Sequence, residues 1–416
     1  MNAHLKQIHP LSWTIIIGTI FGRIAISMSI PFLSIYLIRS MGATPAETGI
    51  VVAASSLIGV FASFYGGYVS DVIGRKKVLF IAIFGWVLVF AGFAFANKVW
   101  IFFIMNALNG LCRATFEPTS RALLADITPK ESKLLVFNLR YAAINIGVVI
   151  GPLLGLQAGA SDSNSVFLIA AAVYACYGIC LVVQFRRYPE LGQANQANEQ
   201  RLGLIEALKA TGRNRTFMLV LIGMIFCVLG YGHFDSTLAQ YMEMSPRIEE
   251  GVRWFSYLIS LNAVVVLVIQ YPLVRFAARF APALPIIAGN LFTGASLVLF
   301  GMFDTLPLLM LGVVIFTIGE VLVFTATDVL VDRIAEPELR GAYFGMFGFN
   351  NLGAVLAPLL GGFLLEGLGV ASSQLIFALL GLTTFAGIPF LYLAHRSMQR
   401  LELARVKREG QPFISS

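Results

Sequence analysis

Long apolar stretches separated by short polar segments dominate this sequence. They fall at residues 13–38, 48–70, 78–96, 100–124, 136–158, 166–185, 216–241, 253–274, 284–303, 307–331, 342–365 and 374–394. Each is close to the roughly 20 residues that a helix needs to cross a bilayer. A backbone in lipid must satisfy its own hydrogen bonds, and the chain lacks the alternating ten-residue segments of a membrane barrel. The pattern therefore predicts an all-α integral membrane protein with twelve transmembrane helices.

Composition agrees with this interpretation. Hydrophobic residues make up 58% of the chain and charged residues only 12%, whereas a soluble domain is roughly a quarter charged. A cytosolic enzyme, a disordered protein and a fibrous protein are therefore excluded. The first apolar stretch is too long for a cleaved signal peptide and has no small-residue cleavage site after it.

The distribution of basic residues predicts the orientation. With the N-terminus in the cytoplasm, 21 Lys and Arg residues lie in cytoplasmic segments and 4 lie outside, namely Arg39, Lys98, Arg247 and Arg253. Cytoplasmic loops carry the excess of basic residues, so we expect both termini in the cytoplasm. The net charge of +7 then reflects orientation and not a nucleic-acid partner. We expect a multi-pass protein of a plasma membrane, from a bacterium.

A polar stretch at 186–215 divides the chain into two halves. We expect a six-helix bundle over 1–190, a cytoplasmic linker over 191–214, and a second bundle with a cytoplasmic tail over 215–416. The linker begins with flexible composition and ends with apolar residues at helical spacing. These are Leu202, Leu204, Ile205 and Leu208. They predict either a helix along the inner membrane surface or an extension of the seventh transmembrane helix.

The two halves repeat each other. An offset of 206 residues places NIGVVIGPLLG (145–155) on NLGAVLAPLLG (351–361). Two parallel six-helix repeats are typical of a transporter whose binding site lies between the halves.

The loop after the second stretch carries a motif. It reads Gly67-x3-Asp71-x2-Gly74-Arg75-Lys76-Lys77. Gly74 permits a tight turn, Asp71 can cap a helix or pair with a base, and the cations hold the loop in the cytoplasm. The motif resembles the signature loop of the major facilitator superfamily, from which it departs at Val72. The resemblance implies that fold, with two pseudo-symmetric six-helix bundles.

The fifth stretch carries Gly147, Gly151, Pro152 and Gly155. Small residues four apart let two helices pack closely, and Pro152 adds a kink. The segment resembles the antiporter motif of the twelve-helix drug–proton antiporters, although the leading glycine is replaced by Asn138. That resemblance implies export. The alternative is a plain packing face, because Gly353, Pro358 and Gly361 repeat the pattern.

The fourth stretch, NGLCRATFEPTSRALLADITP, resembles that of the MdtH-type multidrug exporters, with an acid before a proline at Glu117. This resemblance implies an amphipathic small-molecule substrate, and we expect a monomer. Many drug antiporters have an arginine four residues before a Gln-Gly pair in this helix. At the aligned Asn109-Gly110 the arginine position holds Asn106, and this chain has Arg113 one turn later.

Charged residues in the middle of apolar stretches are costly and mark functional sites. They are Arg23, Arg113, Glu117, Asp235, Glu320 and Asp328. Proton coupling needs a carboxylate that is neutral in one conformation and ionised in the other, and our candidates are Asp235, Glu320 and Glu117. The alternative is that each is a structural or cavity-lining acid. Arg113 and Glu117 are four residues apart, so they share a helix face and can pair.

Further residues are candidates for a substrate cavity or a gate. Helices that line the cavity in this family carry Phe21, Phe116, Tyr231, Phe234 and Phe324, beside the polar candidates Arg23, Arg113, His233 and Asp328. We expect His233 to be a hydrogen-bonded neighbour of the site. Asp126 and Asp332, near the cytoplasmic ends of their helices, are candidates for gating or capping together with the signature loop.

The chain shows no nucleotide-binding, metal-binding or hydrolase motif. We therefore predict no enzyme and no cofactor, with the proton gradient as the energy source. The predicted function is a proton-coupled exporter of amphipathic small molecules, a multidrug-type antiporter. The alternative is an exporter or flippase of a specific anionic or zwitterionic metabolite, lipid or peptide, because Arg23, Arg113 and Arg140 are unusual in a site that selects lipophilic cations.

Overall fold

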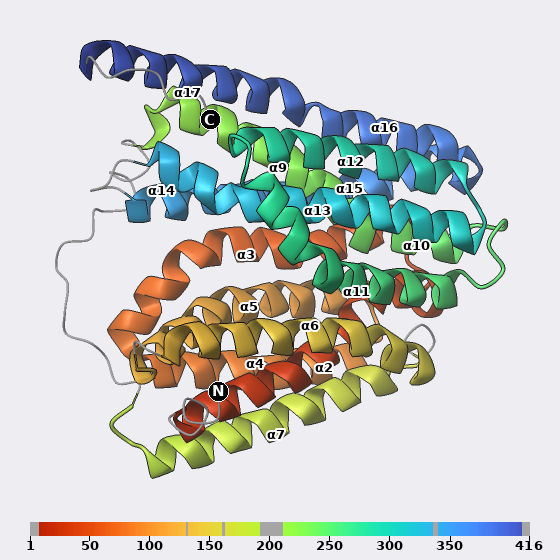
Figure 1. Cartoon of the computed structure of the whole chain (residues 1–416). Helices are drawn as coiled ribbons and strands as arrows, with labels where there is room; N and C mark the ends of the chain where they lie inside the picture. The colour runs from red at the N-terminus through yellow and green to blue at the C-terminus, as the bar shows by residue number, and fades with distance from the viewer. Residues whose placement is uncertain (1–7, 130–131, 160–162, 192–210, 336–339, 410–416) are drawn as a thin grey trace.

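The computed structural model describes residues 8–129, 132–159, 163–191, 211–335 and 340–409. Within these ranges all regular structure is helical, and twelve spans are long and apolar enough to cross a membrane. This confirms the predicted all-α membrane architecture. The start of α2 and the end of α17 lie at one end of the bundle, on the left in Figure 1.

Each half contributes six spans, shown from red to yellow and from green to blue in Figure 1. The first half contains α2 (Pro10–Met41), α3 (Pro45–Ile73), α4 (Arg75–Phe95), α5 (Val99–Ile127), α6 (Lys133–Gln157) and α7 (Ser165–Arg187). The second contains α9 (Arg215–Asp235), α10 (Thr237–Met244), α11 (Gly251–Ala277), α12 (Ala283–Met302), α13 (Leu306–Ile334), α14 (Arg340–Phe347), the 3-10 turn η3 (Gly348–Asn351), α15 (Leu352–Leu368), the turn η4 (Val370–Ser372), α16 (Ser373–Phe385) and α17 (Gly387–Glu409).

The packing within the halves repeats as the sequence predicts. In the first half α2 packs on α6 and α7, α5 packs on α3 and α4, and α4 packs on α7. In the second half α9 packs on α15 and α17, α13 packs on α11 and α12, and α12 packs on α16. Each of these contacts in one bundle thus has its counterpart in the other, which is the pseudo-symmetry expected of duplicated halves,.

Local signals explain several helix boundaries. Thr44 and Glu47 form a reciprocal capping box in front of α3, whose first residue is Pro45, so two orphan backbone donors are satisfied. Asn214 caps α9 by accepting a hydrogen bond from the Phe217 N–H at 3.0 Å. α17 runs to Glu409, well beyond the apolar stretch that ends at 394, because a helix need not stop where hydrophobicity does.

The two halves meet along two helix pairs, α3 with α15 and α6 with α11. A Cβ atom placed on Gly49 would lie 2.2 Å from the Pro358 carbonyl oxygen, and one on Gly362 would lie 2.3 Å from that of Pro45. Only glycine permits these approaches. The predicted linker boundaries at 190 and 214 stay predictions, and residues 202–208 with their two alternatives lie outside the described ranges.

Candidate transport site

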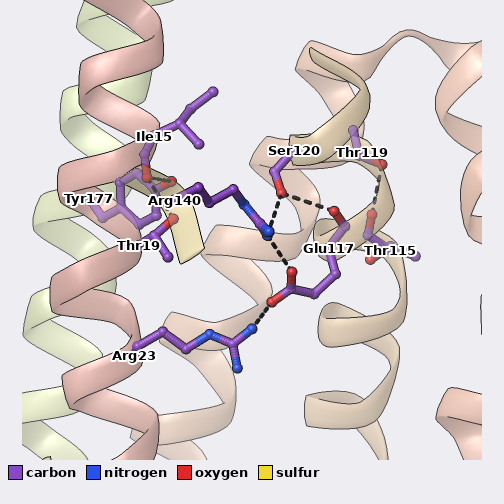
Figure 2. Close-up of polar contacts among 9 residues, drawn as sticks. All are labelled: Ile15, Thr19, Arg23, Thr115, Glu117, Thr119, Ser120, Arg140 and Tyr177. Atoms are coloured by element: carbon purple, nitrogen blue, oxygen red, sulfur yellow. Dashed lines mark hydrogen bonds and ion pairs between the residues drawn. The ribbon is translucent and has the colours of Figure 1, made fainter. Parts of the chain in front are cut away.

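Glu117 is the centre of an ionic cluster within the first half. Its carboxylate pairs with Arg23 of α2 through one oxygen and with Arg140 of α6 through the other. Figure 2 shows both guanidinium groups reaching this carboxylate from different helices. Arg140 is only 5% exposed, and its terminal nitrogen also lies 3.4 Å from the Ser120 hydroxyl. The cluster therefore joins three helices through charges that lipid would otherwise exclude.

The expected pair between Arg113 and Glu117 is not formed. Both Glu117 oxygens are taken by arginines of other helices. Arg113 is exposed and makes no hydrogen bond or ion pair to the residues that the structure describes. The spacing of Arg113 and Glu117 on one helix would permit an ion pair. Arg23 and Arg140 occupy the Glu117 carboxylate instead, and because they are distant in sequence the spacing could not predict this.

A small cavity of about 20 Å³ adjoins this cluster, which is room for roughly one water molecule. Aromatic rings form much of its wall. Trp86 stacks on Tyr174 with ring centroids 4.9 Å apart, and Phe116 contacts Trp86 edge-on at 5.3 Å. Phe116, 6% exposed, therefore borders this small cavity as a packed core residue and does not form an open wall.

A second polar cluster lies in the other half. Asn262 of α11 donates a hydrogen bond to the Glu320 carboxylate of α13 at 2.7 Å and one to the Thr317 hydroxyl at 2.9 Å. Glu320 also interacts with Tyr231 and Asp235 of α9. The sequence pattern did not single out Asn262, although an amide inside an apolar stretch is a signal that could have found it.

Asp235 and Arg113 interact electrostatically across the boundary between the halves. Asp235 ends α9 and is exposed, and its carboxylate interacts electrostatically with the Arg113 guanidinium of α5. Asp235 makes no hydrogen bond to any described residue. Opposite charges from the two halves therefore interact here, and Glu320 interacts with Asp235 from within the second half. In transporters built from two such repeats the substrate site lies between the halves.

The neighbours of Asp235 on α9 have different surroundings. His233 is fully buried, and its Nδ1 lies 2.9 Å from the Thr237 hydroxyl, so it is a hydrogen-bonded core residue. Phe234 is 2% exposed and stacks on Phe316 with centroids 4.6 Å apart. Both side chains are buried in this structure. His233 has the hydrogen bond expected of a neighbour of the site, whereas Phe234 packs in the core, and the role of either in substrate binding stays a prediction. Successive residues of a helix point in directions about 100° apart, so they cannot all face one cavity.

Two predicted aromatic candidates are exposed. Phe324 is 39% exposed and contacts Tyr231 edge-on at 5.1 Å, whereas Phe21 is 54% exposed. Tyr231 therefore joins the Phe324 ring to the polar cluster around Glu320. The Asp328 side chain lies outside the described part of the chain.

The signature loop forms a tight turn between α3 and α4. Gly74 has φ +94°, a conformation that favours glycine,. Arg75 pairs with Asp126 at 2.9 Å and so ties the start of α4 to the end of α5, while the Lys76 ammonium lies 5.7 Å from the Phe185 ring centroid. The side chain of Asp71 and the surroundings of Gly67 are outside the described residues, and Asp332 is exposed at the end of α13.

The glycines of the fifth span form the contact between α6 and α2. Cβ atoms on Gly147, Gly151 and Gly155 would lie 2.4, 2.6 and 2.4 Å from atoms of Arg23, Ser27 and Met28 respectively. The Pro152 carbonyl, on the same helix, accepts a hydrogen bond from Ser256 of α11 at 2.8 Å. The motif thus has the packing function that its spacing predicts, and Gly147 brings α6 close to Arg23.

Comparison with known proteins agrees with this architecture. The family model described as Major Facilitator Superfamily matches residues 15–349 and 251–415. The chain is 49% identical over 394 residues to the uncharacterized MFS-type transporter YqjV of Bacillus subtilis (strain 168), covering 95% of this chain and 96% of the relative. This chain therefore belongs to the major facilitator superfamily and is a membrane transporter, not an enzyme.

More distant relatives have more specific names. A Na(+), Li(+), K(+)/H(+) antiporter of Planococcus maritimus is 26% identical, covering 83% of this chain and 87% of the relative. The multidrug resistance protein MdtH of Yersinia pestis (strain Pestoides F) is 26% identical, covering 80% of each chain. Among solved structures, the nucleoside transporter NupG superposes with a TM-score of 0.80 at 15% identity, covering 92% of this chain and 99% of that one. This last likeness shows the fold alone.

Proposed function

We propose that this transporter is a proton-coupled exporter of amphipathic small molecules that works by alternating access of its two halves. The observation that carries the proposal is a pair of neighbouring carboxylates in the second half, Asp235 and Glu320, of which Asp235 interacts with a cation of the first half. Arg113 is the cation that interacts with Asp235 there. A carboxylate whose charge partner belongs to the other half changes its surroundings when the halves move, so its proton affinity changes with conformation.

The arrangement of the two halves supports the same mechanism. They touch along two matched helix pairs, α3 with α15 and α6 with α11, and rocking about such contacts exposes a central site to each side in turn. The relatives named as a cation–proton antiporter and as a multidrug resistance protein support proton coupling and export of drug-like compounds. We further propose a monomer in the plasma membrane with both termini in the cytoplasm.

Proteoliposomes test this proposal. An imposed pH gradient should drive accumulation of an amphipathic dye against its own concentration gradient, and a protonophore should abolish the accumulation. Substrate-driven alkalinisation or acidification of the lumen, read from a pH-sensitive dye, provides the reciprocal measurement because coupling between two ligands is mutual. Uphill transport that persists after complete collapse of the proton gradient would contradict proton antiport.

A further inference from the structure

The charges at the centre of the first half are unbalanced. Arg23, Arg113 and Arg140 lie around a single acid, Glu117, in this part of the structure. Both Glu117 oxygens are already paired, one with Arg23 and one with Arg140. Arginine stays charged in proteins, so this wall of the site carries more positive than negative charge.

Arg113 is the member of this group that a ligand can reach. Its side chain is exposed and has no hydrogen-bond partner or ion pair among the described residues. Arg23 repels its charge, and Asp235 from the other half attracts it without a hydrogen bond. A guanidinium group in a membrane span is costly unless an anion or water satisfies its donors.

Arg140 is the buried member of this group and adds to its positive charge. Its side chain is 6% exposed, yet its Nε has no hydrogen-bond partner in the structure. It borders the cavity of about 20 Å³ beside Glu117. That cavity has room for roughly one water molecule, so the body of a substrate must lie on the exposed side of the cluster, toward Arg113.

An aromatic surface lies next to Arg113 on the opposite half. Tyr231 interacts with Arg113, and the exposed Phe324 ring contacts Tyr231 edge-on with centroids 5.1 Å apart. A ligand with an anionic group and a flat apolar body fits both features. Its anionic group would accept hydrogen bonds from the Arg113 guanidinium while its apolar body covers the aromatic surface.

We propose that the transported substrate carries an anionic group, a carboxylate, sulfonate or phosphate, which Arg113 binds while Arg23 and Arg140 add to the positive field. The apolar part of the substrate packs on Tyr231 and Phe324. This inference names the substrate class for the proposed transport site and rests on that proposal only for the location of the site.

Binding to the purified full-length protein tests the substrate class without any gradient. The probes are three compounds with one ring system: naphthalene-2-sulfonate, 2-naphthol and 2-naphthylmethylamine, which are anionic, neutral and cationic at pH 7.5. Titration calorimetry in detergent should give the sulfonate an affinity roughly tenfold or more above that of the amine, because charge-assisted hydrogen bonds contribute this much.

The variants locate the effect at Arg113. Arg113→Gln should weaken sulfonate binding roughly tenfold or more, and Arg113→Lys should restore part of it. Arg187→Gln, which removes one exposed charge at the end of α7, is the matched control and should bind like the wild type. An unchanged melting temperature of Arg113→Gln shows that the loss is not unfolding.

Equal or tighter binding of the amine overturns the proposal, as does sulfonate binding that Arg113→Gln leaves unchanged or binding of none of the three probes. The result is separable from the test of proton coupling. Sulfonate binding that depends on Arg113, without gradient-driven transport, would support this inference and contradict the antiporter. Gradient-driven transport of amines, without such binding, would do the reverse.

Discussion

At the scale of single residues, the site consists of charges whose partners come from other helices. Glu117 is paired with Arg23 and Arg140, and Glu320 accepts a hydrogen bond from Asn262. Asp235 has no hydrogen bond among the described residues, and its attractive partner is Arg113 of the other half. These differences in surroundings separate a structural acid from candidate proton carriers. Glu117 fits the structural role because both of its oxygens are paired within one half.

Neutral replacements of the two candidate carriers should uncouple transport from protons. Asp235→Asn or Glu320→Gln should retain ligand binding and lose most gradient-driven accumulation in proteoliposomes, because an amide cannot release a proton. Asp304→Asn, an exposed acid between α12 and α13, is the matched control and should pump normally. Unchanged pumping by both carrier variants would show that the proton travels elsewhere.

Removing Glu117 should instead destabilise the protein. Glu117→Ala leaves the buried Arg140 guanidinium without its counter-charge, and breaking a buried ion pair in this way costs about 3–5 kcal/mol. We expect a clear fall in the melting temperature of the purified protein. Glu249→Ala removes an exposed acid between α10 and α11 and should lower the melting temperature far less. A wild-type melting temperature for Glu117→Ala would refute the structural role.

At the scale of helices, glycine determines where the halves and their helices touch. Gly147, Gly151 and Gly155 bring α6 onto α2 within one half, and Gly49 brings α3 onto α15 across the two halves. Lipid tails are as apolar as the helix surfaces, so the hydrophobic effect does not drive helices together in a membrane. Close packing at small residues therefore contributes much of the energy of helix association.

Adding one methyl group at Gly49 should force α3 and α15 apart. In Gly49→Ala the new Cβ would meet the Pro358 carbonyl at 2.2 Å, so the helices must move apart. We expect a lower melting temperature and reduced transport. Gly59→Ala on the same helix has no atom within 4 Å of its new Cβ and should be neutral or slightly stabilising, because alanine favours helices over glycine. Equal behaviour of the two variants would refute the tight crossing.

At the scale of the whole molecule, duplication and charge distribution define how the chain sits in a membrane. The described residues contain twelve spans, and an even number of crossings predicts that both ends of the chain lie on one side of the membrane. The excess of Lys and Arg on that side predicts that it is the cytoplasmic one.

Fusions at the C-terminus test this orientation in cells. A green fluorescent protein fused after Ser416 should be fluorescent, and alkaline phosphatase fused there should be inactive, since it matures only outside the cytoplasm. Fusion within the segment between α4 and α5, at Lys98, should give the opposite pattern. Phosphatase activity at the C-terminus would reverse the topology and, with it, the proposed direction of transport.

The fold could be predicted from sequence to a large extent, because its information is local or periodic. Apolar stretches of membrane length mark the spans, and the matching NIGVVIGPLLG and NLGAVLAPLLG segments mark the repeat. For the site, the sequence predicted only which charged residues are energetically costly to place in a membrane span, and not which of them contact one another. Arg113 and Glu117 were identified as charges in a membrane span, but spacing along one helix suggested that they pair with each other, and the structure pairs Glu117 with two arginines of other helices.

By itself the sequence determined the membrane environment, the twelve spans, the duplicated halves and the residues too polar to lie in lipid without a purpose. The hydrophobicity of each segment and the similarity between the two halves are sufficient to predict these features, because both can be read from the linear sequence. Only the tertiary structure decided that Arg140 pairs with Glu117, that His233 and Phe234 are buried, and that Arg113 interacts with Asp235 of the other half. Those outcomes depend on the rotation of each helix and on its neighbours, which the order of residues along one segment does not contain.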